Sequence, residues 1–256
     1  MSKYADATQW FRALTPRPRS SVRLFCFPYA GGSAAIFHDW ARGLPPDVEV
    51  CAAMLPGRGS RMLDAPLTRI PLMVEHLSDA ITPYLDKPFA FVGHSMGALI
   101  GFELARCLRR KAGVQPAQLF VSGCRAPHLP DPAPPPYNLP DPELIEFLRE
   151  LNGMPEEILE HAELMALLLP ILRADLEAVA TYAYADGRPL GCPISAYGGL
   201  RDPRAKRENL AAWREQTTAG FILRMFDGDH FFIHQAAPRF ISTLGRELSR
   251  LTGEAA

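Results

Sequence analysis

FVGHSMG, residues 91–97, ends an apolar run in a serine that has a glycine two positions away on either side, and a long helical pattern follows it. A serine directly before a helix is often an N-cap, because its oxygen accepts a hydrogen bond from a first-turn N–H. That interpretation of Ser95 leaves both glycines unexplained. The spacing G-x-S-x-G is typical of a nucleophile elbow, a sharp strand-to-helix turn that exposes a serine hydroxyl. The motif therefore indicates a catalytic Ser95, with the N-cap as the alternative.

Apolar runs alternate with helical patterns on both sides of this turn. Strands are expected at residues 22–27, 48–55, 89–93, 119–123, 192–197 and 221–226. Helices are expected up to about Gly43 and at residues 71–85, 96–110, 210–217 and 238–251. This alternation predicts an α/β fold, with a mostly parallel central sheet and helices on both of its faces.

The alternation breaks after Arg125. Residues 126–142, APHLPDPAPPPYNLPDP, are too rich in proline for a helix or a central strand and predict a semi-rigid connector. Three helical patterns without an intervening strand follow at residues 143–152, 156–169 and 171–185, the last two separated by Pro170. We expect one domain, residues 1–256, with its core at 1–125 and 188–256 and a helical lid inserted at 126–187.

Polar residues follow three of the expected strands. In open α/β sheets, ligands bind at the carboxyl ends of the strands. Ser95, Asp202 and His230 each follow one strand, in the chain order expected of α/β-hydrolases. His230 would act as the base and Asp202 would fix its tautomer. Asp227 and Asp229 are rival partners for His230 by proximity, but a tight turn seldom presents such a near carboxylate to the ring.

A tetrahedral intermediate needs two N–H donors for its oxyanion. The Met96 amide, directly after the serine, is expected to be one of them. The segment Tyr29-Ala30-Gly31-Gly32 follows the first strand, and Ala30 is the expected second donor. A phosphate-binding loop is the competing interpretation, but neither G-x-x-x-x-G-K-[ST] nor G-x-G-x-x-G follows this strand.

Composition restricts the partners. The formal net charge of -1 gives no basic field for nucleic acid, and the most apolar run, residues 164–172, is too short to span a membrane. The first eleven residues lack the apolar segment of a signal peptide, so we expect a cytoplasmic protein and a monomer. The five cysteines contain no C-x-x-C pair and are interpreted as buried apolar residues rather than nucleophiles. His230 and His234 lack the glutamate of H-E-x-x-H, so neither a metal nor a cofactor is expected.

Six ordered blocks resemble type II thioesterases, the discrete α/β-hydrolases that accompany polyketide synthases and nonribosomal peptide synthetases. They are RLFCFPYAGGSA (23–34), LPGRGSR (55–61), FVGHSMGA (91–98), SGCRAP (122–127), GGLRDP (198–203) and FDGDHFFI (226–233). The resemblance implies the same triad and oxyanion amides as above. It also implies hydrolysis of acyl groups stalled on the phosphopantetheine thiol of acyl or peptidyl carrier proteins. Similar proteins usually carry glutamate after P-G-R, where this chain has Gly59, so the role of residues 56–61 is left open.

Two further expectations follow from this function. Arg58, Arg61 and Arg125 lie in loops at the expected mouth of the site, where they would meet an acidic carrier or be merely solvated. Nine apolar lid residues are expected to wall a small acyl chamber, at least in part: Leu144, Ile145, Phe147, Leu148, Leu151, Leu164, Leu167, Leu168 and Leu172. A fatty-acyl chain-terminating thioesterase, a general carboxylesterase and an inactive binding protein with this fold are the alternatives.

Overall fold

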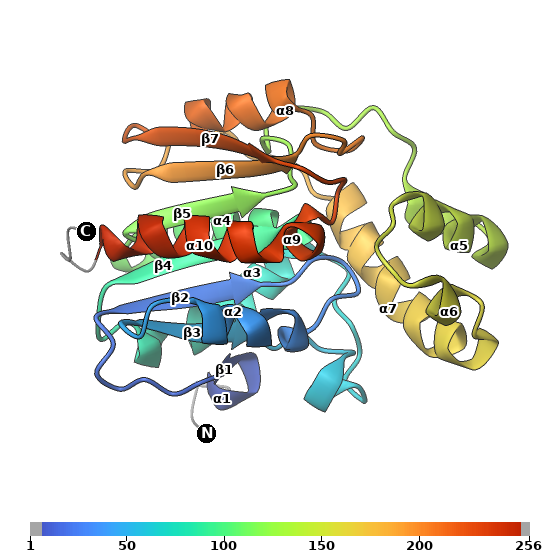
Figure 1. Ribbon diagram of the computed structural model, residues 1–256, viewed down its shortest axis with the longest axis horizontal. Coiled ribbons are helices and arrows are strands. Elements are labelled where there is room, and N and C mark those ends of the chain that lie inside the picture. Colours follow the sequence, from blue (N-terminus) through green and yellow to red (C-terminus); the bar gives the residue numbers. More distant parts are fainter. Residues whose placement is uncertain (1–6, 252–256) are drawn as a thin grey trace.

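A seven-stranded sheet forms the centre of the computed structural model, which describes residues 7–251 (Figure 1). The strand order is β1-β3-β2-β4-β5-β6-β7, and all neighbours are parallel except β1 and β3. The strands are β1 (Phe11–Ala13), β2 (Val22–Phe27), β3 (Val48–Ala53), β4 (Phe89–His94), β5 (Gln118–Ser122), β6 (Ile194–Gly199) and β7 (Phe221–Phe226). The predicted α/β fold with a mostly parallel sheet is confirmed.

Helices cover both faces of this sheet. They are α1 (Ala7–Trp10), α2 (His38–Gly43), α3 (Ile70–Ala80), α4 (Met96–Ala112), α8 (Arg207–Ala211), α9 (Phe232–Gln235) and α10 (Ala237–Ser249). Single 3-10 turns are η1 (Ala34–Phe37), η2 (Gly59–Arg61), η3 (Thr82–Tyr84), η4 (Pro136–Asn138) and η5 (Ala212–Gln216). One hydrophobic core lies under α3 and α4, and a second lies under α2 and α10 on the opposite face (Figure 1). Every residue of β2 to β6 is buried, as continuous apolar strands between two helical layers require.

The helices of the predicted lid lie beyond the carboxyl ends of the central strands (Figure 1). They are α5 (Asp141–Glu150), α6 (Glu156–Leu159) and α7 (Ala162–Ala180), and they share a hydrophobic cluster of their own. The expected helix break at Pro170 is wrong, because α7 continues through this residue. Proline removes one backbone hydrogen bond, but Leu169, Ile171 and Leu172 on either side of it are buried, and their packing holds the helix together. The boundaries of the lid at 126–187 stay a prediction, and "lid" denotes these residues below.

Two smaller features differ from the expectations. The antiparallel edge strand β1 was not expected, because three residues carry too little pattern for recognition. The helix expected to end near Ala185 ends at Ala180. No helix within residues 7–251 is long and apolar enough to cross a membrane. The signal-peptide expectation concerns residues 1–11, of which the first six lie outside the described part of the chain.

Candidate active site

The turn between β4 and α4 holds Ser95 in a strained conformation. Its backbone angles are φ 53° and ψ −117°, a left-handed φ that residues with a side chain rarely adopt. A Cβ atom on Gly93 would lie 2.0 Å from the carbonyl oxygen of Gly97, and one on Gly97 would lie 2.1 Å from that of Phe27. Only glycine fits at both positions. The Ser95 hydroxyl makes no capping bond to α4, so the N-cap interpretation fails and the geometry is that of an elbow.

Asp202 and His230 meet at the same edge of the sheet, after β6 and β7. The Nδ1–H of His230 donates to Oδ2 of Asp202 over 2.9 Å, and both side chains are buried. The other carboxylate oxygen, Oδ1, accepts hydrogen bonds from the amides of Arg204 at 2.8 Å and Ala205 at 3.2 Å. The carboxylate is therefore fixed from both sides and in turn fixes the imidazole ring.

The two rival carboxylates are engaged elsewhere. Asp227 is exposed and forms an ion pair with Arg201. Asp229 accepts hydrogen bonds from the Gln235 side chain at 2.7 Å, the Phe231 amide at 2.8 Å and the Asn152 side chain at 3.3 Å. The hydrogen bonds therefore place Asp202 beside the ring of His230.

Asp202 keeps its negative charge despite its burial. Burial by itself raises the pKa of a carboxyl group, but the hydrogen bond and positive charge of His230 and the amides of Arg204 and Ala205 favour the ionised form. The net effect lowers the pKa of Asp202 below its ordinary value. Asp202 can therefore accept the Nδ1 proton and stabilise an imidazolium, which leaves Nε2 of His230 to exchange protons with a substrate or with Ser95.

The two predicted oxyanion donors border one cavity together with Ser95 and His230. Met96 is the first residue of α4, and first-turn amides have no partner within their own helix. Ala30 lies in the loop after β2, which we name the oxyanion loop, residues 29–32. Within it, Gly32 N–H donates to the carbonyl of Tyr29 at 2.9 Å, and Gly31 has a left-handed φ of 76°.

This cavity, the chamber, has a volume of about 620 Å³. The proline-rich connector between Ala126 and Pro136 supplies the longest continuous part of its lining, and Leu176, Val179 and Ala180 of α7 also border it. Arg125, Asp131 and Arg204 add charge to the lining. Of the nine apolar lid residues expected there, only Phe147 and Leu151 border the chamber. Leu144, Leu148 and Leu172 instead belong to the buried lid cluster, and Leu164 and Leu167 are exposed.

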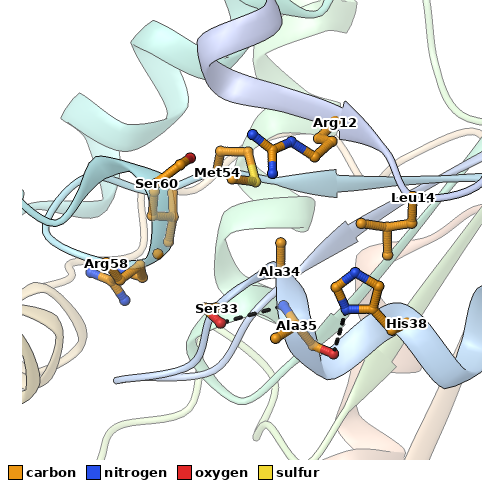
Figure 2. Close-up of a pocket in the computed structure, with 11 residues that line it drawn as sticks. Arg12, Leu14, Ser33, Ala34, Ala35, His38, Met54, Arg58 and Ser60 are labelled. Carbon is orange, nitrogen blue, oxygen red and sulfur yellow. Dashed lines mark hydrogen bonds between the residues drawn. The ribbon is translucent and has the colours of Figure 1, made fainter.

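A second pocket of about 160 Å³ lies between η1, η2 and the ends of β1 and β3 (Figure 2). Arg12, Leu14 and His38 line one side of it, and Ser60 and Arg58 line the other (Figure 2). Ser95, Asp202 and His230 do not border it. This pocket is therefore separate from the candidate catalytic residues.

The three arginines expected at the mouth are not free cations. Arg58 is 6% exposed and forms an ion pair with Asp175 of α7, so its expected role in contacting a carrier is wrong. Arg61 stacks 4.2 Å from the Trp10 ring and pairs with Asp64 at 2.7 Å. Arg125 donates to the carbonyl of Pro130 at 2.6 Å and borders the chamber. A single sequence cannot distinguish these roles, because Asp175, the charged partner of Arg58, and Arg204, a partner of Arg125, are brought close by the tertiary fold.

Asp175 is a buried residue that the sequence analysis missed. It lies in the middle of an apolar lid helix, where a lone carboxylate has no local motif to mark it. Its side chain is fully buried and accepts hydrogen bonds from Arg58 and from the Gly31 amide of the oxyanion loop. A buried aspartate requires such partners, but the sequence does not show that this aspartate is buried, so it carried no signal for the contact.

Neither the cysteines nor a metal cluster provides a competing site within residues 7–251. All five cysteines are buried as free thiols, and burial raises the pKa of Cys124, which borders the chamber, to about 12. Such a thiol stays protonated at neutral pH and is a poor nucleophile. Within residues 7–251, no group of three or more His, Cys, Asp or Glu side chains is arranged to hold a metal ion.

Comparisons with known proteins agree on one family. The model of the thioesterase domain matches residues 22–248. The gramicidin S biosynthesis protein GrsT of Aneurinibacillus migulanus is 44% identical over 97% of this chain and 97% of its own. The RedJ thioesterase from the prodiginine biosynthetic pathway in Streptomyces coelicolor superposes with a TM-score of 0.86 at 38% identity, covering 91% of this chain and 92% of its own.

A third relative is a type II thioesterase by its description. BorB, from the borrelidin biosynthetic cluster, superposes with a TM-score of 0.87 at 34% identity, covering 96% of this chain and 100% of its own. The resemblance to type II thioesterases that the six sequence blocks carry is thereby confirmed. The chain belongs to the thioesterase family and is a hydrolase of the α/β-hydrolase fold.

Proposed function

We propose that this protein hydrolyses stalled or aberrant acyl groups from the phosphopantetheine arm of carrier proteins in polyketide or nonribosomal peptide biosynthesis, in the cytoplasm. Ser95 is the nucleophile, His230 the general base and acid, and Asp202 the residue that orients His230. The observation that carries the proposal is the 2.9 Å hydrogen bond between His230 and Asp202 beside a serine elbow that opens into the chamber. The kinship with GrsT, RedJ and BorB supports the substrate class.

The first half-reaction transfers the acyl group to the enzyme. His230 Nε2 takes the hydroxyl proton of Ser95 while Oγ forms a bond to the thioester carbonyl carbon. The carbonyl oxygen becomes an oxyanion and accepts hydrogen bonds from the amides of Ala30 and Met96. When the carbon–sulfur bond breaks, the imidazolium returns its proton to the pantetheine thiolate, so the carrier leaves with a free thiol.

The second half-reaction removes the acyl group. A water molecule gives its proton to His230 as its oxygen attacks the acyl-Ser95 ester, and the same two amides stabilise the second oxyanion. The ester bond then breaks, and the proton passes from His230 to Ser95 Oγ. The products are a free carboxylic acid and the original serine.

The chamber favours small or polar acyl groups over long apolar chains. Among the apolar residues of its lining are three charged ones, Arg125, Asp131 and Arg204, and a long hydrocarbon chain that reached them would separate them from water. Proline rings and Phe147 supply apolar surface to the lining. We therefore expect a broad and weak acyl preference, which suits removal of diverse stalled groups.

Hydrolysis of acyl-loaded carrier proteins tests this function. Carriers bearing acetyl, propionyl, butyryl, octanoyl and aminoacyl groups are incubated with the enzyme, and the released acid and free carrier thiol are quantified. We expect turnover of several of them, no turnover by Ser95→Ala, and labelling of Ser95 by a fluorophosphonate in the native enzyme only. Preference for oxygen esters over carrier thioesters would favour a general carboxylesterase, and absence of labelling would favour an inactive binding protein.

Arg61 and Arg125 are the remaining candidates for contact with an acidic carrier. Both are partly exposed, although each already has protein partners. Reversal of the Arg61 charge should raise KM for a carrier-bound substrate and leave KM for a small acyl thioester unchanged, whereas reversal of Arg125, which also borders the chamber, should raise KM more for the carrier-bound substrate than for the small one. Equal changes on both substrates would assign these arginines to the fold alone. We propose that the active enzyme is a monomer. Its molar mass, measured by light scattering after size-exclusion chromatography, checks this.

A further inference from the structure

One carboxylate joins three separate parts of the molecule. Asp175 of α7 accepts hydrogen bonds from Arg58 at 2.5 Å and 2.8 Å, one to each carboxylate oxygen. Its Oδ2 also accepts the N–H of Gly31 at 2.7 Å. The helix of the lid, the loop before η2 and the oxyanion loop therefore meet at a single buried side chain.

The contact is buried on all sides. The Arg58 side chain is 6% exposed and that of Asp175 is fully buried. Arg58 also lines the smaller pocket. In Figure 2 its guanidinium points away from Arg12 and His38, which line the other side of that pocket. Arg58 also donates to the carbonyl oxygen of Gly32 at 3.4 Å. The pair thus binds the oxyanion loop at one amide and one carbonyl.

A second contact of α7 fits the same loop. A Cβ atom on Gly31 would lie 2.5 Å from Cδ2 of Leu172, one helical turn before Asp175. Gly31 also has a left-handed φ of 76°, which only glycine adopts without strain. The loop conformation is therefore held against α7 by a hydrogen bond and by close packing.

We propose that Asp175 is a positioning residue that sets the oxyanion loop, so that the oxyanion hole is complete only while helix α7 is docked. The Gly31 amide belongs to the peptide group directly after Ala30, so holding it in place restricts the φ and ψ of Ala30 and with them the direction of the Ala30 amide. The inference rests on the proposed role of Ala30 as an oxyanion donor. According to this inference, the contact between Asp175 and Gly31 forms only when α7 is docked, and the oxyanion hole is complete only when the contact forms.

Displacement of α7 would remove both partners of this contact at once. Gly31 would lose its acceptor, and Arg58 would lose the charge that balances it. The loop would then be free to turn its amides away from the chamber. Hydrolysis would be suppressed in the open form, and a thioester would meet a complete oxyanion hole only after the lid closes over it.

The main alternative is that the ion pair serves stability alone. A double variant separates the two roles, because a buried ion pair replaced by apolar residues of similar size usually keeps its stability. Arg58→Met with Asp175→Leu removes both charges and the acceptor of Gly31 together. We expect this variant to melt near the native temperature while kcat falls by roughly ten- to a hundredfold, less than loss of a whole oxyanion donor would cost.

Two single variants complete the test. Asp175→Asn keeps an oxygen for Gly31 N–H but loses the charge facing Arg58, so most of kcat should be retained. Glu177→Gln is the matched control, because Glu177 on the same helix pairs with Arg69 outside the lid at 2.5 Å, and a glutamine oxygen can still accept this hydrogen bond and keep α7 docked. This control should leave kcat unchanged.

The readouts are the melting temperature, kcat and KM on a small acyl thioester, and the rate at which a fluorophosphonate modifies Ser95. The phosphonate oxygen needs the same donors as a substrate oxyanion, so its reaction should slow in parallel with kcat, with little change in KM. A double variant that is folded and keeps kcat within twofold of the native value overturns the inference, as does an equal loss in Glu177→Gln. If the native enzyme cleaves the small thioester but no acyl carrier, the proposed function fails while this comparison still decides the role of Asp175.

Discussion

Asp202 and His230 lie 28 residues apart in the chain and are joined by a 2.9 Å hydrogen bond between Oδ2 and Nδ1. The bond fixes the tautomer in which Nε2 is free to accept a proton. Two backbone amides hold the other carboxylate oxygen, so the aspartate cannot rotate without losing them. The orientation of the His230 ring thus depends on Asp202, which contacts His230 and not the thioester in the proposed mechanism.

Replacement of Asp202 by asparagine tests this dependence. The amide can still bond to the ring, but its NH₂ group favours the wrong tautomer, so kcat should fall by about 10⁴-fold. Single-turnover hydrolysis of an acyl thioester measures the loss. Asp227→Asn is the matched control, since this exposed carboxylate pairs with Arg201 and should keep native activity. Near-native activity of the Asp202 variant would move the role to another carboxylate.

The buried His94 predicts acid sensitivity. Burial, followed by the nearby His230 and His234, lowers the pKa of His94 well below its ordinary value. In the unfolded chain this histidine binds a proton below about pH 6.5, whereas in the folded chain it stays neutral there. The free energy of unfolding is therefore unaffected by His94 above that pH. It falls as the pH drops further, by at most about 1.4 kcal/mol per pH unit.

Urea unfolding between pH 7.5 and 5.0 measures this effect. His94→Asn can retain the hydrogen bond to Ser122 that His94 makes at 2.9 Å, and it should flatten the pH dependence below 6.5. Above pH 7 the two proteins should show parallel curves. Equal slopes below pH 6.5 would show that other groups cause the acid sensitivity.

The elbow should not tolerate a single methyl group. A Cβ atom on Gly97 would lie 2.1 Å from the carbonyl oxygen of Phe27, a backbone atom that cannot give way without moving β2. Gly97→Ala should therefore reduce the free energy of unfolding by about 3 kcal/mol or more. Gly220→Ala is the control, because its nearest neighbour would be Pro193 at 4.0 Å, and its change should stay within about 0.5 kcal/mol. Comparable losses in both variants would refute the steric explanation.

Acyl-chain preference should be weak. In a long apolar groove each added methylene would gain about 0.8 kcal/mol, or roughly a fourfold rise in kcat/KM. The three charged residues within the chamber lining, Arg125, Asp131 and Arg204, oppose such a progression. Measurement of kcat/KM from acetyl to dodecanoyl groups on one carrier checks this. A steady rise toward a long-chain optimum would indicate a chain-terminating enzyme instead.

The sequence predicted those parts of the site that have local signatures. Gly93, Ser95 and Gly97 are required by one turn, and the ends of β6 and β7 mark the positions of Asp202 and His230. Continuous apolar runs likewise located the buried strands. These features depend on neighbouring residues along the chain, so a single sequence contains them.

Other features depend on contacts between distant segments. Arg58 lies 117 residues from Asp175, and nothing near either residue indicates an ion pair. The helix break expected at Pro170 is absent because the residues on either side of it, Leu169, Ile171 and Leu172, are buried and hold α7 together. Most of the apolar lid residues that were expected to line the chamber pack against one another instead. The periodicity of apolar residues is the same whether they face one another or a ligand, so it cannot distinguish the two cases.

The proline-rich wall of the chamber has a consequence for how new specificities arise. The longest continuous part of the chamber lining comes from a connector that belongs to no strand, while Ser95, Asp202 and His230 are anchored at strand ends. Insertions and replacements in such a segment alter few sheet contacts, and its prolines already limit the entropy that ordering must overcome. The wall can therefore diverge while the reaction centre stays constant, which makes the connector the segment to diversify when the enzyme is redesigned for other acyl groups.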